Sequence, residues 1–464
     1  MLNRSFHYML LGLLGAWFSS AWAADTVYVS LDGTHVEPYN TWETAATNIQ
    51  TAVDYASAHT DSYDTVLVSN GFYYASNSIT PTLGIQITAA LTVKGLAGRE
   101  ATIVSGTNLP APIFIVSNAN AVVEGFTITG GRNIGVKMWN GIVSNCIVSS
   151  NHSGTRSGGC DFMTANAKVF DSIICYNSAQ NIGAAGAGGS AGTLTRCVIV
   201  SNKAADSCGG LAGVKAYNCL IAYNMCENKV AGANGATLVN CTVVSNRVTR
   251  QRAAYQVDGL YGCTLTNCIV AYNGVSDFVA CTSSYSCSPI RQPGEGNIGA
   301  DPQFVDLANS DFRLQFGSPA IDAGTNLAHI TDDLDGNPRP LNGNNLGAFH
   351  DMGCYEMPAY TEGDLSCRLT VTPAAGWGAV TASCQAVLGG ANRAINHYWW
   401  NFGDGSPVQS GASLSTATHT FNQPGRYDIT LTVSNTAGAV ASNKLTDAVV
   451  VGVATSYVAE GGTG

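Results

Sequence analysis

Charge is scarce in this sequence, and positive charge is the scarcer kind. Only 11% of the 464 residues are charged, and 21 Lys and Arg stand against 31 Asp and Glu, which gives a formal net charge of -10. The sequence has no run of basic residues of the sort that neutralises phosphates. Nucleic acid is therefore not an expected partner.

Long apolar segments and metal-binding motifs are also missing. After the first 23 residues, no segment approaches the roughly 20 apolar residues that a membrane helix needs, so no transmembrane segment is predicted. No CxxC or HExxH pattern occurs and the 8 His are scattered, which argues against a zinc cluster. The only cation that the sequence suggests is Ca²⁺, in a loop described below.

The first 23 residues have the pattern of a secretory signal peptide. A basic Arg4 precedes an apolar run over residues 9–18, and the small-x-small sequence 21–23 follows it directly before Ala24. This order of basic, apolar and small residues marks a segment that is removed on export. We therefore predict a signal peptide over 1–23 and a secreted protein, extracellular or at a cell surface.

Glycine and cysteine, in contrast, are plentiful, with 52 and 15 residues. Many glycines suit a chain of short strands and tight turns. An odd number of cysteines cannot all pair within one chain, which excludes a pure disulfide framework.

Five of the cysteines belong to a repeat in which an asparagine follows the cysteine five residues later. The pattern recurs every 22 to 27 residues, with Ser172 in place of the Cys in one copy. Such a period, with one β-rich motif in each copy, predicts a solenoid in which every period is one coil. Coils stacked about 4.8 Å apart align equivalent side chains in ladders. The predicted ladders are Cys146, Cys197, Cys219, Cys241 and Cys268, and Asn151, Asn177, Asn202, Asn224, Asn246 and Asn273.

Period-2 alternation places the Cys and the residue two positions later on the interior face. There the Cys acts as a small hydrophobe; bonding between neighbouring thiols is the alternative, although parallel Cβ vectors suit a disulfide poorly. Each Asn is expected to turn the chain in the left-handed conformation and to bond to its neighbours in the column. Further corners are expected at glycines, namely Gly158-Gly159, Gly188-Gly189, Gly209-Gly210, Gly232 and Gly259.

The position after each Cys should point outward, yet it is apolar. A continuous outward stripe of this kind predicts a covering partner. The candidates are the C-terminal module, the β-sandwich and another protein. The stripe consists of Ile147, Ile173, Val198, Leu220 and Ile269.

In its NCxI-xx-N motif and glycine corners, the region resembles the right-handed parallel β-helix (pectin-lyase-like) family. The resemblance implies such a helix over 24–300, with the segment NIQTAVDYA (48–56) as an N-terminal capping helix. The pieces GADPQFVD, FRLQFGSPAIDAGTN, DLDGNPRP and DMGCYE resemble the C-terminal module of choice-of-anchor Q proteins, here over 301–358. Within this module Asp333, Asp335 and Asn337 alternate as Ca²⁺ ligands do, although the same residues are ordinary turn formers.

The last part of the chain has short alternating strands separated by Gly, Pro and Asn turns, which predicts a β-sandwich over 359–453 and a tail over 454–464. WWNFGDGSP and HTFNQPGRYDITLTVSN resemble the polycystic kidney disease (PKD) domain, an immunoglobulin-like module. Trp400 and Phe402 are expected in its core, whereas Trp399 is a candidate for ligand contact. Cys367 and Cys384, on the first two strands, are the best candidates for a disulfide.

Two functions of different classes remain open. The β-helix family contains many polysaccharide lyases and hydrolases. A lyase here would use Arg250 or Arg252 near Glu227 or Asp258, and a hydrolase would use converging carboxylates. Arg156, Asp206, Lys229 and Trp399 are candidates for substrate binding. Because no set of catalytic residues is recognisable, we expect an exported protein that binds a polysaccharide or a cell-surface protein. The alternative is an enzyme, and a polysaccharide lyase is favoured over a glycoside hydrolase.

Overall fold

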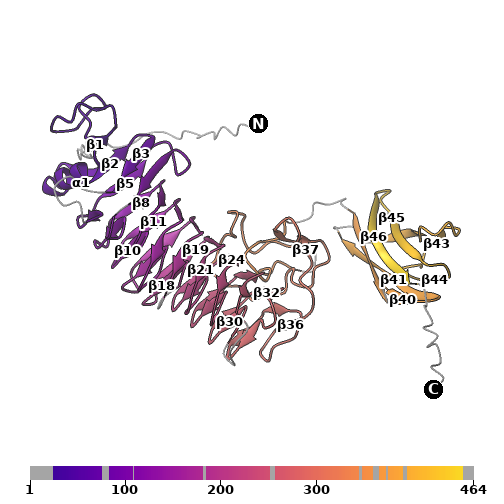
Figure 1. Cartoon of the computed structure of the whole chain (residues 1–464). Helices are drawn as coiled ribbons and strands as arrows, with labels where there is room; N and C mark the ends of the chain where they lie inside the picture. Colours follow the sequence, from indigo (N-terminus) through magenta and orange to yellow (C-terminus); the bar gives the residue numbers. More distant parts are fainter. Residues whose placement is uncertain are drawn as a thin grey trace, which may run out of the picture.

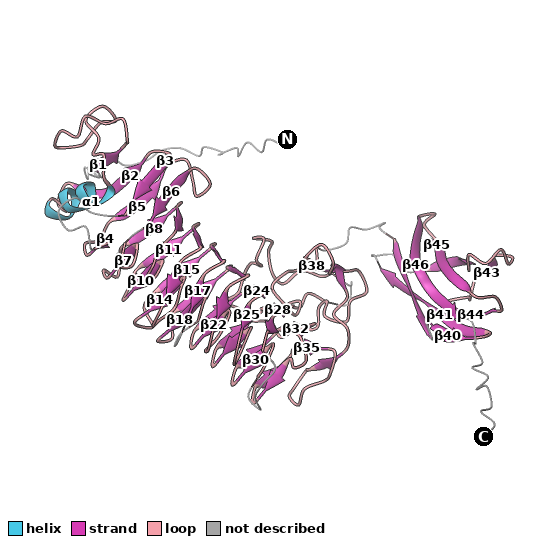
Figure 2. Cartoon of the chain, in the orientation of Figure 1, coloured by secondary structure: helices cyan, strands magenta, loops and turns pink. Residues whose placement is uncertain are grey.

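The computed structural model describes residues 25–75, 83–107, 109–180, 184–250, 256–343, 347–358, 365–372, 375–389 and 394–452. The predicted signal peptide and tail lie outside these ranges, as does Arg252. Figure 1 follows the chain from a stack of short coils to a separate group of longer strands, and Figure 2 shows that the described elements are almost all strands.

Three long parallel sheets form the coils, and each sheet takes one short strand from a coil. The first sheet consists of β1 (Asp25–Val29), β2 (Tyr63–Val68), β5 (Thr92–Gly95), β8 (Val122–Glu124), β11 (Ile142–Ser144), β15 (Lys168–Phe170), β19 (Thr193–Thr195), β23 (Lys215–Tyr217), β27 (Thr237–Val239), β31 (Thr264–Thr266) and β34 (Thr282–Ser284). The second consists of β3 (Gly71–Tyr74), β6 (Thr102–Ser105), β9 (Thr127–Thr129), β12 (Ile147–Ser149), β16 (Ile173–Cys175), β20 (Val198–Val200), β24 (Leu220–Ala222), β28 (Thr242–Val244), β32 (Ile269–Ala271), β35 (Cys287–Ser288) and β36 (Ile298–Gly299). The third consists of β4 (Ile85–Ile87), β7 (Phe114–Val116), β10 (Val136–Met138), β14 (Cys160–Phe162), β18 (Ala187–Gly189), β22 (Leu211–Ala212), β26 (Ala233–Asn234), β30 (Leu260–Tyr261) and β33 (Phe278–Val279).

A fourth, shorter parallel sheet follows the Asn of five coils. Its strands are β13 (His152–Ser153), β17 (Ser178–Ala179), β21 (Lys203–Ala204), β25 (Met225–Cys226) and β29 (Arg247–Val248). The prediction of a parallel solenoid is confirmed, because strands of successive coils pair in parallel and in register in all four sheets.

The interior of the coils is apolar, as strand alternation requires. The five ladder cysteines and the residues two positions after them are fully buried in one continuous core. All 15 cysteines are free thiols. Each ladder thiol donates to the carbonyl oxygen two residues before it, for example from Cys146 Sγ to Ser144 O at 3.2 Å. Burial raises the pKa of Cys146 to about 12, so this thiol remains protonated.

The Asn side chains form a buried column that links the coils. Asn202 Nδ2 donates to Asn224 Oδ1 at 3.0 Å and to Ile174 O at 2.9 Å, and the same pattern recurs along the ladder. The expectation that Asn itself adopts the left-handed conformation is wrong. That conformation belongs to the preceding residue, such as Tyr176 (φ 55°) or Ser201 (φ 57°), and this frees the Asn to point inward.

These left-handed positions alternate between Ser and Tyr in successive coils. The order is Ser150, Tyr176, Ser201, Tyr223, Ser245 and Tyr272. The residue before each Cys is left-handed as well, and in the later coils these residues are Asn218, Asn240 and Asn267. Each of these six coils thus makes two of its turns with non-glycine residues.

The glycines have a different role from the one predicted. The stacked column is Gly159, Gly186, Gly210, Gly232 and Gly259, so Gly186 takes the place assigned to Gly188-Gly189. A Cβ on Gly210 would lie 2.3 Å from Gly232 O. Close approach of neighbouring coils, and not a positive φ, therefore requires glycine in this column.

Helix α1 (Ile49–Ala58) begins at the cap Asn48, whose side chain accepts from Thr51 N at 3.2 Å. Its apolar face, which includes Ile49, Val53 and Ala56, is buried in the same core as β1 and β2. No helix in the described ranges is long and apolar enough to cross a bilayer.

The C-terminal module covers the apolar outward stripe over the last coils. Its antiparallel pair β37 (Phe304–Asp306) and β38 (Asp311–Leu314) and the segment around Met352 bury Leu220 and Ile269. Upstream on the same face, Ile147 and Ile173 remain half-exposed. Three candidates were predicted to cover the apolar stripe: the C-terminal module, the β-sandwich and another protein. The C-terminal module is the one that covers the downstream part of the stripe.

Polar contacts fix the module against the coil corners. Asn218 Nδ2 donates to Asp332 O at 2.8 Å, and Asn267 Nδ2 donates to Thr325 O at 2.8 Å. Two of the alternating tyrosines also take part. Tyr223 Oη lies 2.7 Å from Ser310 Oγ and its ring packs 6.0 Å from Phe312; Tyr272 Oη donates to Asp301 Oδ1 at 2.6 Å and its ring packs 6.1 Å from Phe304.

The last strands form two mainly antiparallel sheets that pack around a core of their own. One contains β39 (Ser366–Thr372), β41 (Val380–Gly389) and β44 (Thr416–Phe421); the other contains β40 (Ala375–Trp377), β46 (Val440–Gly452), β45 (Gly425–Asn435), β42 (Ile395–Asn401) and β43 (Gln409–Gly411). Trp400 and Phe402 are fully buried here, as predicted for the sandwich core.

The disulfide predicted between Cys367 and Cys384 is not formed. On the paired strands Cys367 lies opposite Leu388, whereas Cys384 lies opposite Val371. The two cysteines are therefore offset by four residues along the sheet, roughly 13 Å, which is beyond the reach of a disulfide. Each is a buried free thiol.

Candidate functional site

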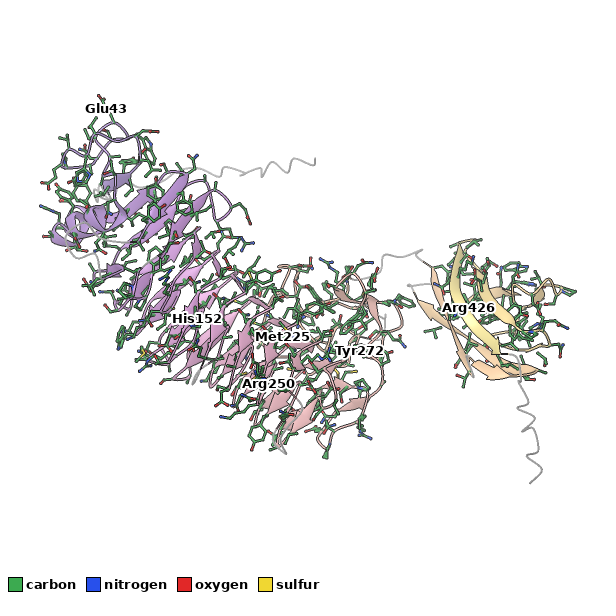
Figure 3. All side chains as sticks on the ribbon, viewed as in Figure 1. Glu43, His152, Met225, Arg250, Tyr272 and Arg426 are labelled. Atoms are coloured by element: carbon green, nitrogen blue, oxygen red, sulfur yellow. The ribbon has the colours of Figure 1, made fainter. Side chains whose placement is uncertain are left out.

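The outer face of the fourth sheet carries the residue that directly follows each of five ladder Asn residues, and Lys203 and Arg247 among these are charged. Alternation turns the second residue of each strand inward, where Ala179, Ala204, Cys226 and Val248 pack together. The first residue faces outward; these residues are His152, Ser178, Lys203, Met225 and Arg247. Figure 3 labels His152, Met225 and Arg250, which lie on different coils along the solenoid.

The structure brings Arg250 and Glu227 together, but as part of a three-membered ion cluster. Arg250 Nη2 lies 3.0 Å from Glu227 Oε2, and Lys203 Nζ lies 3.4 Å from Glu227 Oε1. One coil separates each member from the next, so Glu227 is the carboxylate between two cations. The arrangement neutralises Glu227 and engages the guanidinium of Arg250.

Asp258 has a backbone role. It is only 6% exposed, and its two oxygens accept from Val248 N at 2.6 Å and from Val275 N at 2.7 Å. These bonds connect the last coils through their loops, and both carboxylate oxygens of Asp258 serve the fold.

The substrate-binding candidates on the coils occupy two places. Lys229 Nζ lies 2.8 Å from Asp206 Oδ2, one coil away. Arg156 Nη1 lies 3.4 Å from Asp161 Oδ2, several coils upstream. Burial raises the pKa of Asp161, while the positive charge of Arg156 opposes that shift.

Lys229 also borders a hollow that the sequence analysis missed. The hollow has a volume of roughly 230 Å³ and is lined by Lys229, Val230, Asn234 and Tyr261. Asn234 and Tyr261 are register partners on β26 and β30, and 37% of Tyr261 is exposed. An aromatic face, an amide and an ammonium group thus border one concave surface.

A regular sequence signal marks both of these residues. Each lies two positions after a glycine of the stacked column, at Gly232 and Gly259, and alternation makes that position point outward. Listing the outward position coil by coil would have found Asn234 and Tyr261 next to each other.

A larger hollow, of roughly 470 Å³, lies at the last coil between residues 272–278 and 288–292. Asp277 borders it and accepts from Asn273 Nδ2 at 2.8 Å, so this carboxylate ends the Asn ladder. Burial raises the pKa of Asp277. Val275 and Ile290 are strongly exposed at the rim.

The suggested Ca²⁺ loop is organised by hydrogen bonds. Asp333 is fully buried; its Oδ1 accepts from Asp335 N and Asn337 N, and its Oδ2 accepts from Asn337 Nδ2 and Glu356 N, at 2.7 to 3.0 Å. Asp335 pairs with Arg313 at 2.7 Å. These contacts are those of a turn, and nowhere among the described residues do three or more His, Cys, Asp or Glu side chains gather to hold a metal ion.

In the sandwich Trp399 lies on the outer face of β42. It is 36% exposed and its ring lies 4.4 Å from that of His397. Asp404 is in the following turn, where it accepts from Ser406 and lies 2.7 Å from His419 Nε2. Despite partial burial, these bonds lower the pKa of Asp404 to about 2.

Comparison with known proteins identifies part of the chain. The sequence model of the PKD domain family matches residues 381–451. No curated protein has a sequence that matches this chain significantly.

Among solved structures, a pectate lyase has a TM-score of 0.46 at 14% identity, covering 72% of this chain and 98% of its own. A tailspike protein of an Acinetobacter baumannii bacteriophage, described as a capsular polysaccharide depolymerase, has a TM-score of 0.32 at 9% identity, covering 91% of this chain and 78% of its own. At this level of likeness neither one assigns an activity to the chain.

Proposed function

We propose that this protein is exported and binds an extracellular polysaccharide along the outside of its coils, with the hollow beside Tyr261 as a principal contact. The observation that carries the proposal is the convergence of Lys229, Asn234 and Tyr261 on one concave surface. Ligand sites combine an apolar wall with a few convergent polar groups. A sugar ring can stack its C–H face on Tyr261, and the Asn234 amide can bond to hydroxyls. The Lys229 ammonium, which pairs with Asp206 through one N–H, has further N–H groups for a hydroxyl or a uronate.

The charge pairing supports binding over catalysis. Among the described residues of this face, Glu227, Asp206, Asp161 and Asp258 are each paired with a cation or with backbone N–H groups. Hydrolysis requires two carboxylates converging on one bond, and a lyase requires a base that is not held in an ion pair.

The remaining parts have supporting roles in this proposal. Helix α1 caps the open N-terminal end of a right-handed coil, which protects a sheet edge from pairing with other chains. Residues 301–358 act as a terminal module of the choice-of-anchor Q kind. The PKD domain serves as a spacer, or as a second glycan contact through Trp399.

The test measures binding to uronate-containing and neutral polysaccharides, with Ca²⁺ present, by calorimetry on the purified mature protein. Loss of a stacked ring is worth about 1 kcal/mol, so Tyr261→Ala should weaken binding about fivefold. Lys229→Ala should weaken binding of the acidic polymer more than that of the neutral one.

Matched controls are Tyr176→Ala and Lys215→Ala, exposed residues of the same types elsewhere on the coils. Equal losses in the controls, or no binding by the parent protein, would exclude the hollow as the site. Formation of unsaturated products, abolished by Arg250→Ala, would establish the lyase alternative instead.

A further inference from the structure

Cys281 differs from the other cysteines because it is the only one of the 15 whose residue is not buried. It belongs to a column of corner residues that precede the strands of the first sheet. This column consists of Ala167, Gly192, Val214, Ala236, Cys263 and Cys281. The first sheet ends at β34, so no further rung of this column covers Cys281.

Cys263 lies directly beneath Cys281 in this column. Thr264 and Thr282, the residues that follow them, are register partners in parallel strands, which places the two Cα atoms roughly 4.8 Å apart. That separation is within the range of disulfides. Cys263 N donates to Cys281 Sγ at 3.3 Å, so the partly buried sulfur already faces its neighbour.

The surroundings also favour a reactive Cys281. The neighbouring Cys263 side chain and the backbone groups of the adjoining turn lower the pKa of Cys281 to about 7, against the opposing effect of burial. A thiolate is the form that reacts with oxidants. Cys281 differs in this respect from Cys146, whose pKa burial raises to about 12, and Cys281 is also partly open to solvent.

We propose that Cys263 and Cys281 are a redox modification site, at which a peroxide joins the last two coils of the first sheet by a disulfide. The Cys281 thiolate attacks the peroxide, which leaves a sulfenic acid on Cys281 and hydroxide. The Cys263 sulfur then displaces the sulfenic hydroxyl, and the Cys263 proton leaves with it as water. Two thiols are oxidised to one disulfide, and hydrogen peroxide is reduced to two molecules of water.

The end of the sheet suits this reaction. Parallel Cβ vectors disfavour a disulfide between two rungs that are held on both sides. In the first sheet β34 pairs with β31 alone, so Cys281 can adjust its position without breaking a second ladder. The disulfide would then hold the last rung to the one beneath it.

The experiment treats the full mature protein with hydrogen peroxide near pH 7.5, alkylates the remaining thiols after unfolding, and maps them by peptide mass spectrometry. Before oxidation, Cys281 should be the fast-reacting thiol towards Ellman's reagent in the folded protein. After oxidation, a peptide linking Cys263 to Cys281 should appear, about 2 Da lighter than the two free peptides together.

Alanine already occupies this column at Ala167 and Ala236, so alanine variants are expected to fold. Cys281→Ala should abolish both the fast labelling and the crosslink, whereas Cys263→Ala should slow the labelling of Cys281 and stop its oxidation at a sulfenic acid that dimedone traps. Cys268→Ser is the matched control, since Ser172 occupies that ladder, and should leave the crosslink unchanged. The proposal is overturned if peroxide modifies Cys281 while Cys263 remains alkylatable, or if Cys281 in the folded protein reacts no faster than the buried thiols.

Discussion

Replacing Asn202 with alanine removes one amide from the middle of the Asn column. The amide is fully buried and makes four hydrogen bonds: its Oδ1 accepts from Asn177 N and Asn177 Nδ2, and its Nδ2 donates to Ile174 O and Asn224 Oδ1, all at 2.9 to 3.0 Å. A typical intramolecular hydrogen bond contributes about 1 kcal/mol net, and a buried group left without its partner costs more. We therefore expect Asn202→Ala to lower the free energy of unfolding by about 4 kcal/mol.

Urea denaturation followed by circular dichroism measures this loss, and hydrogen exchange locates it. Because a solenoid is stabilised by contacts between neighbouring coils, protection should fall first at β16, β20 and β24. Asn166→Ala is the matched control, since that Asn is exposed at another turn, and should change stability by less than about 0.5 kcal/mol. Equal effects of the two substitutions would refute the view that the column stabilises the coils.

Asn202→Asp tests the hydrogen bonds that the Asn202 side chain donates separately from those that it accepts. The introduced carboxylate can still accept from Asn177 but faces two carbonyl oxygens without a proton. It should destabilise at least as much as alanine at pH 7 and should recover part of the loss at acidic pH, where the protonated acid can donate one hydrogen bond.

Three further predictions concern other parts of the fold. Burial lowers the pKa of His350 from 6.5 to about 4. The stability that the neutral imidazole contributes is therefore complete above pH 6.5 and is lost as the pH falls through 4. Thermal melts at several pH values should show the wild type losing about 3 kcal/mol of stability over that range relative to His350→Asn. Gly210→Ala places a methyl group 2.3 Å from a carbonyl oxygen of the next coil and should cost at least about 2 kcal/mol in urea denaturation, whereas Gly154→Ala, whose Cβ meets no neighbour within 4 Å, should be nearly neutral. Ile269→Asp puts a charge beneath the C-terminal module and should expose that module to limited proteolysis, while Ile147→Asp, half-exposed upstream on the same face, should leave the digestion pattern unchanged.

The sequence was most informative where one position repeats with one physical demand. The two-residue alternation placed the Cys column inside the coils and the period aligned the Asn residues in a column, because register repeats in every coil. The same reasoning misplaced the left-handed residue, since Ser201 and Tyr223 carry no sequence preference for that conformation. The left-handed conformation of Ser201 and Tyr223 is set by the packing of neighbouring coils, and the position of the Asn in the sequence does not indicate it.

The candidate site was only partly visible from sequence. Pairing of Arg250 with Glu227 follows from stacking, since each lies shortly after an Asn of the ladder in adjacent coils. The backbone role of Asp258 depends on which N–H groups the loops bring to it, and no sequence pattern encodes that. Cys367 and Cys384 were suggested by strand assignment alone, and a register offset of four residues on the paired strands separates them.

The alternation of Ser and Tyr before the Asn ladder limits how this chain can change in length. The backbone repeats with every coil, but the chemistry of this edge repeats with every second coil, a pitch of roughly 9.6 Å. The C-terminal module contacts Tyr223 and Tyr272, which are two coils apart. Insertion or deletion of one coil between them would present a serine where the module meets a tyrosine. Coils in this stretch should therefore be gained or lost in pairs.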